Sequence, residues 1–458
     1  MSTKLMHALL LGGLTCGLAL AEENWTPLFN GKDLEGWVKR GGEASYKVEN
    51  GEVVGIATAD TPNTFLCTPR DYADFILEYD FKVDPRLNSG VQIRSQSFDQ
   101  PTKILWEDVV KEVPAARVHG YQVEIDPSDR GWAVGLFEEA ARGWLYPGMC
   151  GGDKNAFTQQ GKKLFKANDW NHVRVEAKGD HIKTFLNGEL RAEIHDSRVQ
   201  SGFIGLQVHS IGKNKDMAGA EVRWRNIRIQ DLGGLPNTLS EAEKAAGWRL
   251  LWDGKTTEGW RSARSNEFPK GGWEVKDGML IIHEGGGGES AAAGDIITKE
   301  KFSDFELVVD FKMTPGANSG IKYFVDPELN KGPGSSIGPE FQILDDKRHP
   351  DAKLGKDGNR TIGSLYDLIT AAADKKPNPV GGWNRARILS RGNKVTYWLN
   401  GGKTVEFERG TEEWRTLVAG SKYKKWPNFG ELKEGHILLQ DHGNLVFFQN
   451  IKIRTKFD

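Results

Sequence analysis

The chain has 458 residues, with 61 basic and 63 acidic side chains and a formal net charge of −2 at pH 7. Because the charges are balanced and form no block of one sign, the sequence lacks the basic surface that nucleic-acid binding requires. We therefore expect a small-molecule partner and no nucleic acid. The length is sufficient for about three domains, although a single β-sandwich often exceeds roughly 200 residues.

The N-terminal residues have the pattern of a secretory signal peptide. Lys4 precedes an apolar run from Ala8 to Leu20, and small residues precede Glu22, so we expect cleavage after Ala21 and a secreted or periplasmic protein. Lipid attachment at Cys16 is disfavoured, because Gly13 occupies the position where such a signal has Leu. No later apolar run is long enough to span a membrane.

Cys67 and Cys150 are the two cysteines that remain after this cleavage. Sequence spacing does not show whether their Cβ atoms approach each other, so a disulfide between them stays open.

Short alternating segments indicate an all-β protein. Residues 75–83, 173–177 and 222–229 alternate apolar and polar side chains, as strands with one apolar face do. Hairpin turns are predicted at Asn50-Gly51, Asn187-Gly188, Asp277-Gly278 and Asn400-Gly401, where positive φ angles are needed. Many short antiparallel strands predict β-sandwiches or jelly rolls.

The same sequence motifs occur once in each half of the chain. Asn88–Ile93 returns as Asn318–Tyr323, and Trp170-Asn171 returns as Trp383-Asn384. Such a long period excludes short solenoid repeats and predicts two tandem domains, at residues 22–231 and 248–458. Residues 232–247 are the expected linker, with a short helix that begins at a Ser240/Glu243 capping box and ends at Gly247.

Polar residues share one face of three predicted strands in each half, because alternate residues of a strand point the same way. If these strands lie in one sheet, each half gathers amide, carboxylate, cationic and imidazole groups. Such a cluster suits a small polar ligand such as a sugar, and the simpler alternative is a solvated outer face. The second-half set is Asn318, Lys322, Glu340, Gln342, Gln440 and His442, and the first-half set is Asn88, Gln92, Arg94, Gln122, Glu124, Gln207 and His209.

Two loops of the second half contain further candidate residues. The aromatic loop 423–429 offers Trp426 as a wall for sugar stacking, although such residues more often hold their own loop in place. Gly334–Gly338 matches G-x-S-x-G, but no strand precedes it and no helix follows it, so a nucleophilic Ser335 is not expected.

The second half resembles the 3-keto-disaccharide hydrolase domain, a bacterial family with a concanavalin-like jelly-roll sandwich. The resemblance rests on Asn318–Gly320, Gly338–Asp345, Gly363–Asp367, Trp383-Asn384, Leu399–Gly401 and Ile437–Gly443. Gly120–Asp126 and Glu138–Tyr146 make the first half similar to a more divergent member. This chain has Gly382 where the family usually has Glu before Trp-Asn, and Gln449 where it has Arg before Asn-Ile. We expect the change at Gly382 to alter a turn near the site.

The resemblance implies action on glycosides that are already oxidised at C3. A C3 ketone acidifies the C2 proton, so a base can form an enediolate that expels the C1 substituent, and water can then add. We expect Glu340 or His442 as the base, Lys322, His349 or a bound cation as the electrophile, and Tyr366 as an acid. Glu124, His209, Arg94 and Arg142 are the first-half counterparts. No cofactor is assigned beyond a hypothetical divalent cation at Glu340, Asp345 and His442.

Three other functions remain open from the sequence. The two halves can form a carbohydrate-binding, lectin-like pair without catalysis, because a fold does not fix a function. Alternatively, the first half is a non-catalytic partner of an enzymatic second half. Ordinary glycosidase action through an acidic pair such as Glu138-Glu139 is the third, less favoured reading.

Overall fold

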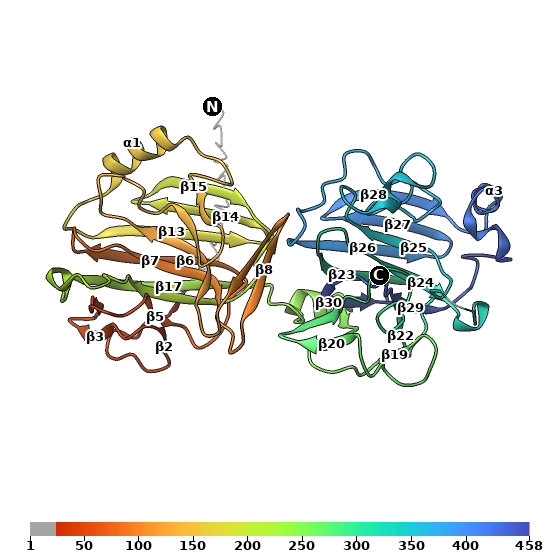
Figure 1. Ribbon diagram of the computed structural model, residues 1–458, viewed down its shortest axis with the longest axis horizontal. Coiled ribbons are helices and arrows are strands. Elements are labelled where there is room, and N and C mark those ends of the chain that lie inside the picture. Colours follow the sequence, from red (N-terminus) through yellow and green to blue (C-terminus); the bar gives the residue numbers. More distant parts are fainter. Residues whose placement is uncertain (1–23, 333, 458) are drawn as a thin grey trace, which may run out of the picture.

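The computed structural model describes residues 24–332 and 334–457, so the expected signal peptide lies outside the described residues. The chain forms two β-sandwiches side by side along the long axis of the molecule, as Figure 1 shows. The all-β, two-sandwich architecture expected from the sequence is therefore confirmed. In the described part of the chain, no helix is both long and apolar enough to cross a membrane.

The first domain packs an eight-stranded sheet against a seven-stranded sheet. The eight-stranded sheet has the order β15 (Glu189–His195), β14 (His181–Leu186), β13 (Asn171–Lys178), β6 (Asp74–Val83), β17 (Glu221–Gly233), β4 (Glu52–Ile56) and β3 (Ser45–Glu49), with β1 (Thr26–Pro27) on β17. The seven-stranded sheet has the order β12 (Gly143–Tyr146), β11 (Leu136–Glu139), β10 (His119–Ile125), β7 (Ser89–Gln96), β16 (Phe203–Val208), β5 (Thr64–Cys67) and β2 (Val38–Gly41).

The second domain repeats this plan with an eight-stranded and a five-stranded sheet. The first has the order β20 (Trp273–Lys276), β21 (Met279–Ile282), β30 (Val446–Arg454), β23 (Phe305–Met313), β26 (Trp383–Arg391), β27 (Lys394–Leu399) and β28 (Gly402–Glu408), with β18 (Arg249–Leu250) on β30. The second has the order β19 (Trp260–Ser262), β22 (Ile296–Thr298), β29 (His436–Leu439), β24 (Asn318–Val325) and β25 (Glu340–Leu344).

The predicted turns and the linker helix are confirmed. Asn187 and Gly188 between β14 and β15 have φ angles of 51° and 90°, and Asn400 and Gly401 between β27 and β28 have 50° and 84°. These consecutive positive values suit the right-handed twist of the flanking strands. The linker holds α2 (Glu241–Ala245) with a complete Ser240/Glu243 capping box.

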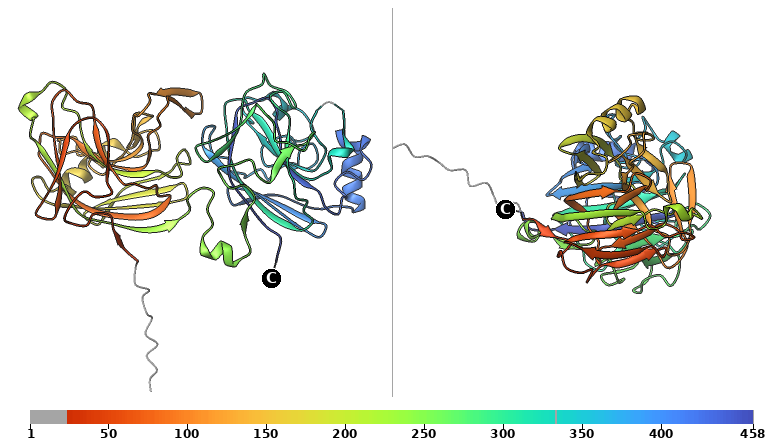
Figure 2. Two further views of the ribbon diagram at one scale, coloured as in Figure 1. Left: turned by 90° about the horizontal axis from the view of Figure 1, so that it is seen from below. Right: turned by 90° about the vertical axis from the view of Figure 1, so that its left-hand side faces the viewer.

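Several elements were not foreseen from the sequence. These are α1 (Lys154–Leu164), α3 (Glu412–Ala419), the 3-10 turns η1 (Lys215–Met217), η2 (Pro327–Leu329), η3 (Pro350–Lys353) and η4 (Lys422–Lys425), and a hairpin of β8 (Thr102–Trp106) and β9 (Val109–Val113). The hairpin lies beside the second domain in Figures 1 and 2, and the Glu107 amide donates to the Val380 carbonyl at 2.8 Å.

Each sandwich has its own apolar core between its two sheets. Tyr79 and Val123 are fully buried in the first core, and Phe311 and Phe341 in the second. The polar cluster of each domain therefore lies on the outer face of the smaller sheet. Cys67 and Cys150 are both free thiols, so the structure contains no disulfide between them.

Candidate active site

The centre of the second-domain cluster is a carboxylate beside an ammonium group. Lys322 of β24 pairs in register with Glu340 of β25, and Lys322 Nζ lies 3.5 Å from Glu340 Oε2. Only 3% of Glu340 and 5% of Lys322 are exposed. Burial raises the pKa of Glu340 above its usual value, although Lys322 and Lys422 act in the opposite direction. A carboxylate with a raised pKa is suited to accept a proton near neutral pH.

Gly320 makes room for this carboxylate. A Cβ atom at position 320 would lie 2.1 Å from Glu340 Oε1, so a side chain there would displace Glu340. Gln342 of β25 pairs with Gly320 on one side. On the other side, the backbone N–H of Gln440 donates to the Gly320 carbonyl at 3.0 Å. The Glu340 carboxylate therefore lies over bare backbone between two glutamine side chains.

Three buried polar atoms of this cluster have no partner among the described residues. They are Gln342 Oε1, Gln440 Oε1 and His442 Nδ1. Gln342 Nε2 donates to Asn318 Oδ1 at 3.4 Å, so the amide is oriented while its oxygen stays free. Buried polar atoms normally have partners, and a ligand with several hydroxyl groups would supply them. The alternative of a solvated outer face is therefore wrong here, because these side chains are buried.

Ser335 and Asp295 hold Lys322 in place. Its ammonium donates to Ser335 Oγ at 2.6 Å, and the Ser335 hydroxyl in turn donates to the fully buried Asp295. Burial raises the pKa of Asp295, whereas Lys322 lowers it. Burial alone would also raise the pKa of Glu289, but Lys322 and Lys422 hold that pKa below its usual value. Sequence reasoning missed Asp295, Glu289 and Lys422, and it dismissed the motif that contains Ser335.

Tyr366 lies next to Glu340 because residues 363–366 extend the edge of β25. The Tyr366 amide donates to the Glu340 carbonyl at 3.0 Å, and its hydroxyl donates to Asp351 Oδ2 at 2.7 Å. Burial, reinforced by this hydrogen bond, raises the pKa of Tyr366. The hydroxyl therefore stays protonated and is committed to Asp351, which favours a positioning role over that of a proton donor.

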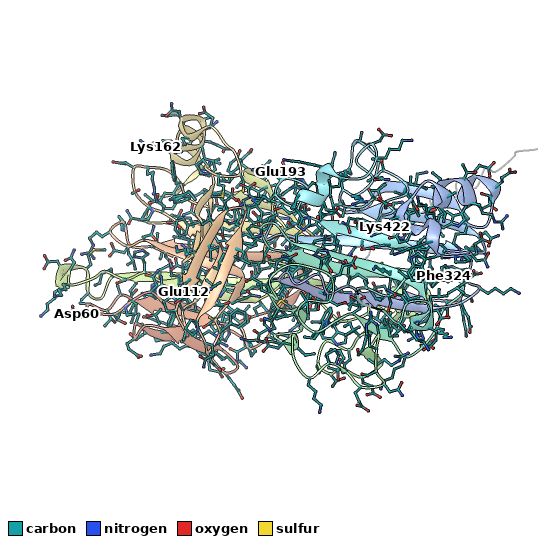
Figure 3. All side chains as sticks on the ribbon, turned by 45° about the vertical axis from the view of Figure 1, so that its right-hand side comes forward. Asp60, Glu112, Lys162, Glu193, Phe324 and Lys422 are labelled. Carbon is teal, nitrogen blue, oxygen red and sulfur yellow. The ribbon has the colours of Figure 1, made fainter. Side chains whose placement is uncertain are left out.

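Lys422 and the histidines lie around the same cluster. Lys422 Nζ is 4.1 Å from the centre of the Tyr366 ring, and Figure 3 labels Lys422 on the second domain. His349 and His442 meet edge to face, with ring centres 5.8 Å apart. Burial lowers the pKa of both histidines, so both are neutral at pH 7.

Two expectations about the second domain are not met. The described residues contain no group of three or more His, Cys, Asp or Glu side chains that could hold a metal ion, so Glu340, Asp345 and His442 do not form one. Asp345 instead accepts from the Gly316 amide at 2.8 Å and from Arg348 at 3.0 Å. Trp426 packs against the core, which fits a role in holding its own loop.

The first domain assembles a related cluster with different chemistry. Gln92 and Gln207 donate to Gln122 Oε1 at 2.5 and 2.9 Å, and Asn88 donates to Glu124 Oε1 at 2.7 Å. Burial raises the pKa of Glu124 to about 7. His209 directly follows β16, and its Nδ1 is 2.7 Å from the Ser210 carbonyl.

Strand register shows which groups differ between the domains. Gly90 and Gly320 occupy equivalent positions, so Gln122 replaces Glu340 and Gln92 replaces Lys322. In the first domain, Phe137 pairs with Gln122 at the position that Tyr366 occupies beside Glu340 in the second domain. Likewise, Phe65 of the first domain occupies the position of Asp295. The first domain thus lacks the central carboxylate, the ammonium and the phenol of the second domain.

Arg94 does not belong to this cluster, contrary to expectation. Its φ angle of 46° marks an irregularity in β7 that reverses the alternation of side chains. The guanidinium donates to the carbonyls of Ala73 and Gly179 at 2.7 and 2.6 Å. Arg94 therefore stabilises the contact between the two sheets.

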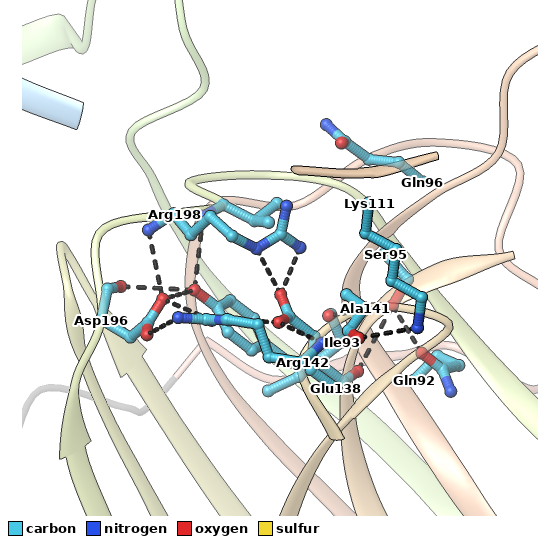
Figure 4. A network of polar contacts seen from close by, with 12 residues as sticks. Gln92, Ile93, Ser95, Gln96, Lys111, Glu138, Ala141, Arg142, Asp196 and Arg198 are labelled. Atoms are coloured by element: carbon cyan, nitrogen blue, oxygen red, sulfur yellow. Dashed lines mark hydrogen bonds and ion pairs between the residues drawn. The ribbon is translucent and has the colours of Figure 1, made fainter. Parts of the chain in front are cut away.

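Arg142 is also placed elsewhere. Figure 4 shows it in a network with Glu138, Asp196 and Arg198, and its two hydrogen bonds to Asp196 measure 2.7 and 3.0 Å. The guanidinium also lies 4.2 Å from the Trp106 ring centre. Arg142 is therefore paired with carboxylates of the protein itself, and this placement does not support its predicted role in sugar binding.

Comparison with known families gives a match in both domains. The model of the 3-keto-alpha-glucoside-1,2-lyase-like domain matches residues 24–230 and again residues 247–454. The chain belongs to this family. The family resemblance read from the sequence is thus confirmed, and the lyase-like domain occurs twice in tandem.

Relatives of this lyase-like domain include a 3-keto-disaccharide hydrolase from Bacteroides thetaiotaomicron, which is 37% identical over 231 residues, 46% of this chain and 79% of the relative. A crystal structure of a candidate glycosyl hydrolase from Parabacteroides distasonis is 31% identical and covers 48% of this chain and 100% of its own, with a TM-score of 0.43. The carbohydrate-binding module CBM66 from Bacillus subtilis is 18% identical, covers 43% and 95%, and has a TM-score of 0.24.

The two departures from the expected lyase-like pattern both lie where the domains meet. A Cβ atom at Gly382 would be 2.4 Å from Ser197 Oγ and 3.5 Å from the Trp106 ring, so a glutamate there would collide with the first domain. Gln449 Nε2 donates to Gln200 Oε1 across the boundary at 2.6 Å. Gly382 thus affects domain docking, because the turn that contains it packs against Ser197 and Trp106 of the first domain.

Proposed function

We propose that the second domain cleaves the glycosidic bond of 3-keto-glycosides or 3-keto-disaccharides. The observation that carries the proposal is the buried Glu340 carboxylate, which lies 3.5 Å from the Lys322 ammonium. The unpartnered oxygens of Gln342 and Gln440 provide the hydrogen-bonding capacity that sugar hydroxyls require. The name of the Bacteroides relative supports the same substrate class.

The proposed reaction begins with transfer of the C2 proton to Glu340. The electron pair of the C2–H bond moves toward the C3 carbonyl, whose oxygen becomes an enediolate oxygen stabilised by the Lys322 ammonium. When this pair forms the C1–C2 double bond, the bond from C1 to the leaving oxygen breaks. Glu340 then returns its proton to that oxygen.

Net hydrolysis requires one more step. Water adds across the C1–C2 double bond: Glu340 takes one proton from water as its oxygen bonds to C1, and Glu340 then gives that proton to C2, so that the carboxylate is regenerated and the 3-keto sugar is released. His442 and Tyr366 orient the substrate in this scheme, and His442 is the alternative base. The ketone is essential, because it alone makes the C2 proton acidic enough for a carboxylate to remove.

The first domain binds carbohydrate without cleaving it in this proposal. Gln122 cannot accept the C2 proton as Glu340 does, and Gln92 provides no positive charge for an enediolate. The first domain nevertheless keeps Asn88, His209 and an unpartnered buried Gln207 Oε1. These retained groups favour a sugar-binding role in which the first domain assists the catalytic second domain.

The deciding experiment uses the mature protein with a chromogenic 3-keto-glucoside and with its unoxidised parent. We expect aglycone release from the keto form alone. Release from the unoxidised glycoside would indicate an ordinary glycosidase. Binding of the unoxidised sugar without release from either compound would indicate a tandem lectin-like protein and would contradict the proposed reaction.

Export is proposed as well, on the basis of the Lys4 and Ala8–Leu20 pattern. Mass spectrometry of the protein from cell fractions checks it. An N-terminus at Glu22 in a periplasmic or extracellular fraction is expected, and an intact N-terminus in the cytoplasm would contradict it.

A further inference from the structure

A cavity of about 730 Å³ lies between the two domains. Both domains and the linker line it, through residues such as Arg40 and His119 of the first domain, Pro236 of the linker, and Lys312 and Trp383 of the second. The volume is in the range of sites that bind small ligands, which often lie between domains. Its described lining contains none of the proposed catalytic residues, so this is a separate feature of the tandem arrangement.

Lys312 lines this cavity, and none of the described charged groups that shift its pKa is a carboxylate. The ammonium lies 4.9 Å from the Trp383 ring centre and 4.5 Å from the Phe447 ring centre. Burial, with help from Arg198, lowers the pKa of Lys312 to about 8. Lys312 is half-buried, and its two cation–π contacts leave its charge without an anion, so an oxyanion in the cavity would be a favourable partner.

His119 is the second unusual group. It is 2% exposed, and neither ring nitrogen has a hydrogen-bond partner among the described residues. Arg40 Nε is also buried and unpartnered. Buried donors of this kind normally meet an acceptor. Burial lowers the pKa of His119 to about 4, so the neutral ring has one N–H donor. An acceptor on a ligand in the cavity would satisfy this N–H and that of Arg40 Nε.

The other charges of the lining leave a cationic excess. Arg70 donates to Asp231 at 2.9 Å, and Arg198, which Figure 4 shows above Glu138, pairs with that carboxylate. Lys103 joins Arg40 and Lys312 as a lining cation, and Asp71 and Asp277 are the lining carboxylates. Apart from the two paired arginines, the lining therefore contains three cations and two carboxylates.

We propose that the cavity between the domains binds an oxyanion, a carboxylate, sulfate or phosphate group, with Lys312, His119 and Arg40 as its contacts. The group is either free or carried by an acidic sugar. An anion held by residues of both domains would also fix their relative orientation, as the Gln449 to Gln200 hydrogen bond does at the same boundary.

The test measures binding of sodium sulfate, sodium phosphate and glucuronate to the full mature chain by isothermal titration calorimetry, at constant ionic strength in sodium chloride. Glucose is the neutral control. We expect one site for an oxyanion, and Lys312→Met should weaken it by roughly tenfold or more, because the charge is removed while the apolar stem is retained. Glucuronate bound more tightly than sulfate and phosphate would identify an acidic sugar as the ligand. Equal or tighter binding of the inorganic anions would identify a free oxyanion.

The internal repeat provides a matched control. Lys82 is the first-domain counterpart of Lys312 and lies 5.2 Å from the Trp170 ring centre, outside this cavity. Lys82→Met should leave anion binding unchanged. Differential scanning calorimetry of both variants without anion checks that they are folded. No binding of any oxyanion above the chloride background, or an equal loss in both variants, would overturn the proposal.

Discussion

Lys322 and Glu340 face each other across β24 and β25 with a separation of 3.5 Å, whereas the equivalent pair in the first domain is Gln92 and Gln122, joined by a hydrogen bond of 2.5 Å. The same backbone position thus holds an ion pair in one domain and an amide pair in the other. An amide pair cannot take up a proton and cannot stabilise a negative oxygen, so the two sandwiches should differ in chemistry although they share a fold.

Replacing Glu340 by Gln tests the proposed base. We expect turnover of a 3-keto-glucoside to fall by about 10² to 10⁴-fold, the usual contribution of a positioned general base. The matched control is Glu124→Gln in the first domain, which removes a carboxylate from the related cluster. It should leave kcat within about threefold, because its lost hydrogen bonds lie in the domain without the proposed catalytic pair. If both variants lose activity equally, catalysis is not confined to the second domain.

Gly320→Ala tests the space that the structure reserves for Glu340. The new methyl group would lie 2.1 Å from Glu340 Oε1 and must push the carboxylate away. We expect kcat to fall by roughly 10²-fold, since a displacement of about 1 Å has that effect on catalytic groups. Gly90→Ala is the control, because its methyl group would meet Gln122 Cδ at 2.6 Å in the first domain. That variant should keep its turnover even if its melting temperature falls.

The pH dependence of kcat/KM should reflect the raised pKa of Glu340. The base acts only when deprotonated, so activity should fall with decreasing pH through a limb that lies above the usual range for glutamate. Lys422 lowers the pKa of Glu340, so Lys422→Met should move this limb to higher pH. A pH–rate profile of both proteins provides the measurement. A limb that does not move, or that moves to lower pH, would contradict the assignment of Glu340 as the titrating base.

Asp441→Ala should destabilise the second domain. Asp441 is fully buried, and its Oδ2 atom accepts from the amides of Ala292, Ala293 and Gly294 at 2.9, 2.7 and 2.7 Å. Removal of the carboxylate leaves these donors unsatisfied, at a cost of about 2–4 kcal/mol. Scanning calorimetry should show an earlier unfolding transition of the second domain.

Asp253→Ala serves as the comparison for that experiment. Asp253 also accepts from backbone amides, those of Lys255 and Thr256 at 2.8 Å, but it is exposed, so water can replace it. Its loss should cost about 1 kcal/mol or less. Equal destabilisation by the two substitutions would show that burial does not determine the contribution of Asp441.

Much of the local structure could be predicted because it depends on nearby residues. Period-two alternation gave the strands, and Asn187-Gly188 and Asn400-Gly401 gave the tight turns, since few residue pairs accept two positive φ angles. The Ser240 capping box gave α2. Alternation also placed Glu340, Gln342 and Lys322 on one face, because side-chain direction along a regular strand follows directly from position.

The same rule failed where a strand is irregular. Arg94 has a positive φ angle, which nothing in its neighbouring residues announces, and the side chain turns toward the opposite sheet. The hairpin of β8 and β9 was missed for a related reason. It has little core of its own, and it is held partly by contact with the second domain through the Glu107 amide.

The sequence by itself determined that this protein is a pair of β-sandwiches of one family with a polar face in each, because repeats, turns and alternation are local properties of the chain. Only the tertiary structure decided that Asp295 and Ser335 support Lys322, that Arg142 forms an ion pair with Asp196, and that a cationic cavity lies between the domains. These relationships join residues that are far apart along the chain. Their distances depend on how strands pair and how domains dock, which no spacing within the sequence specifies.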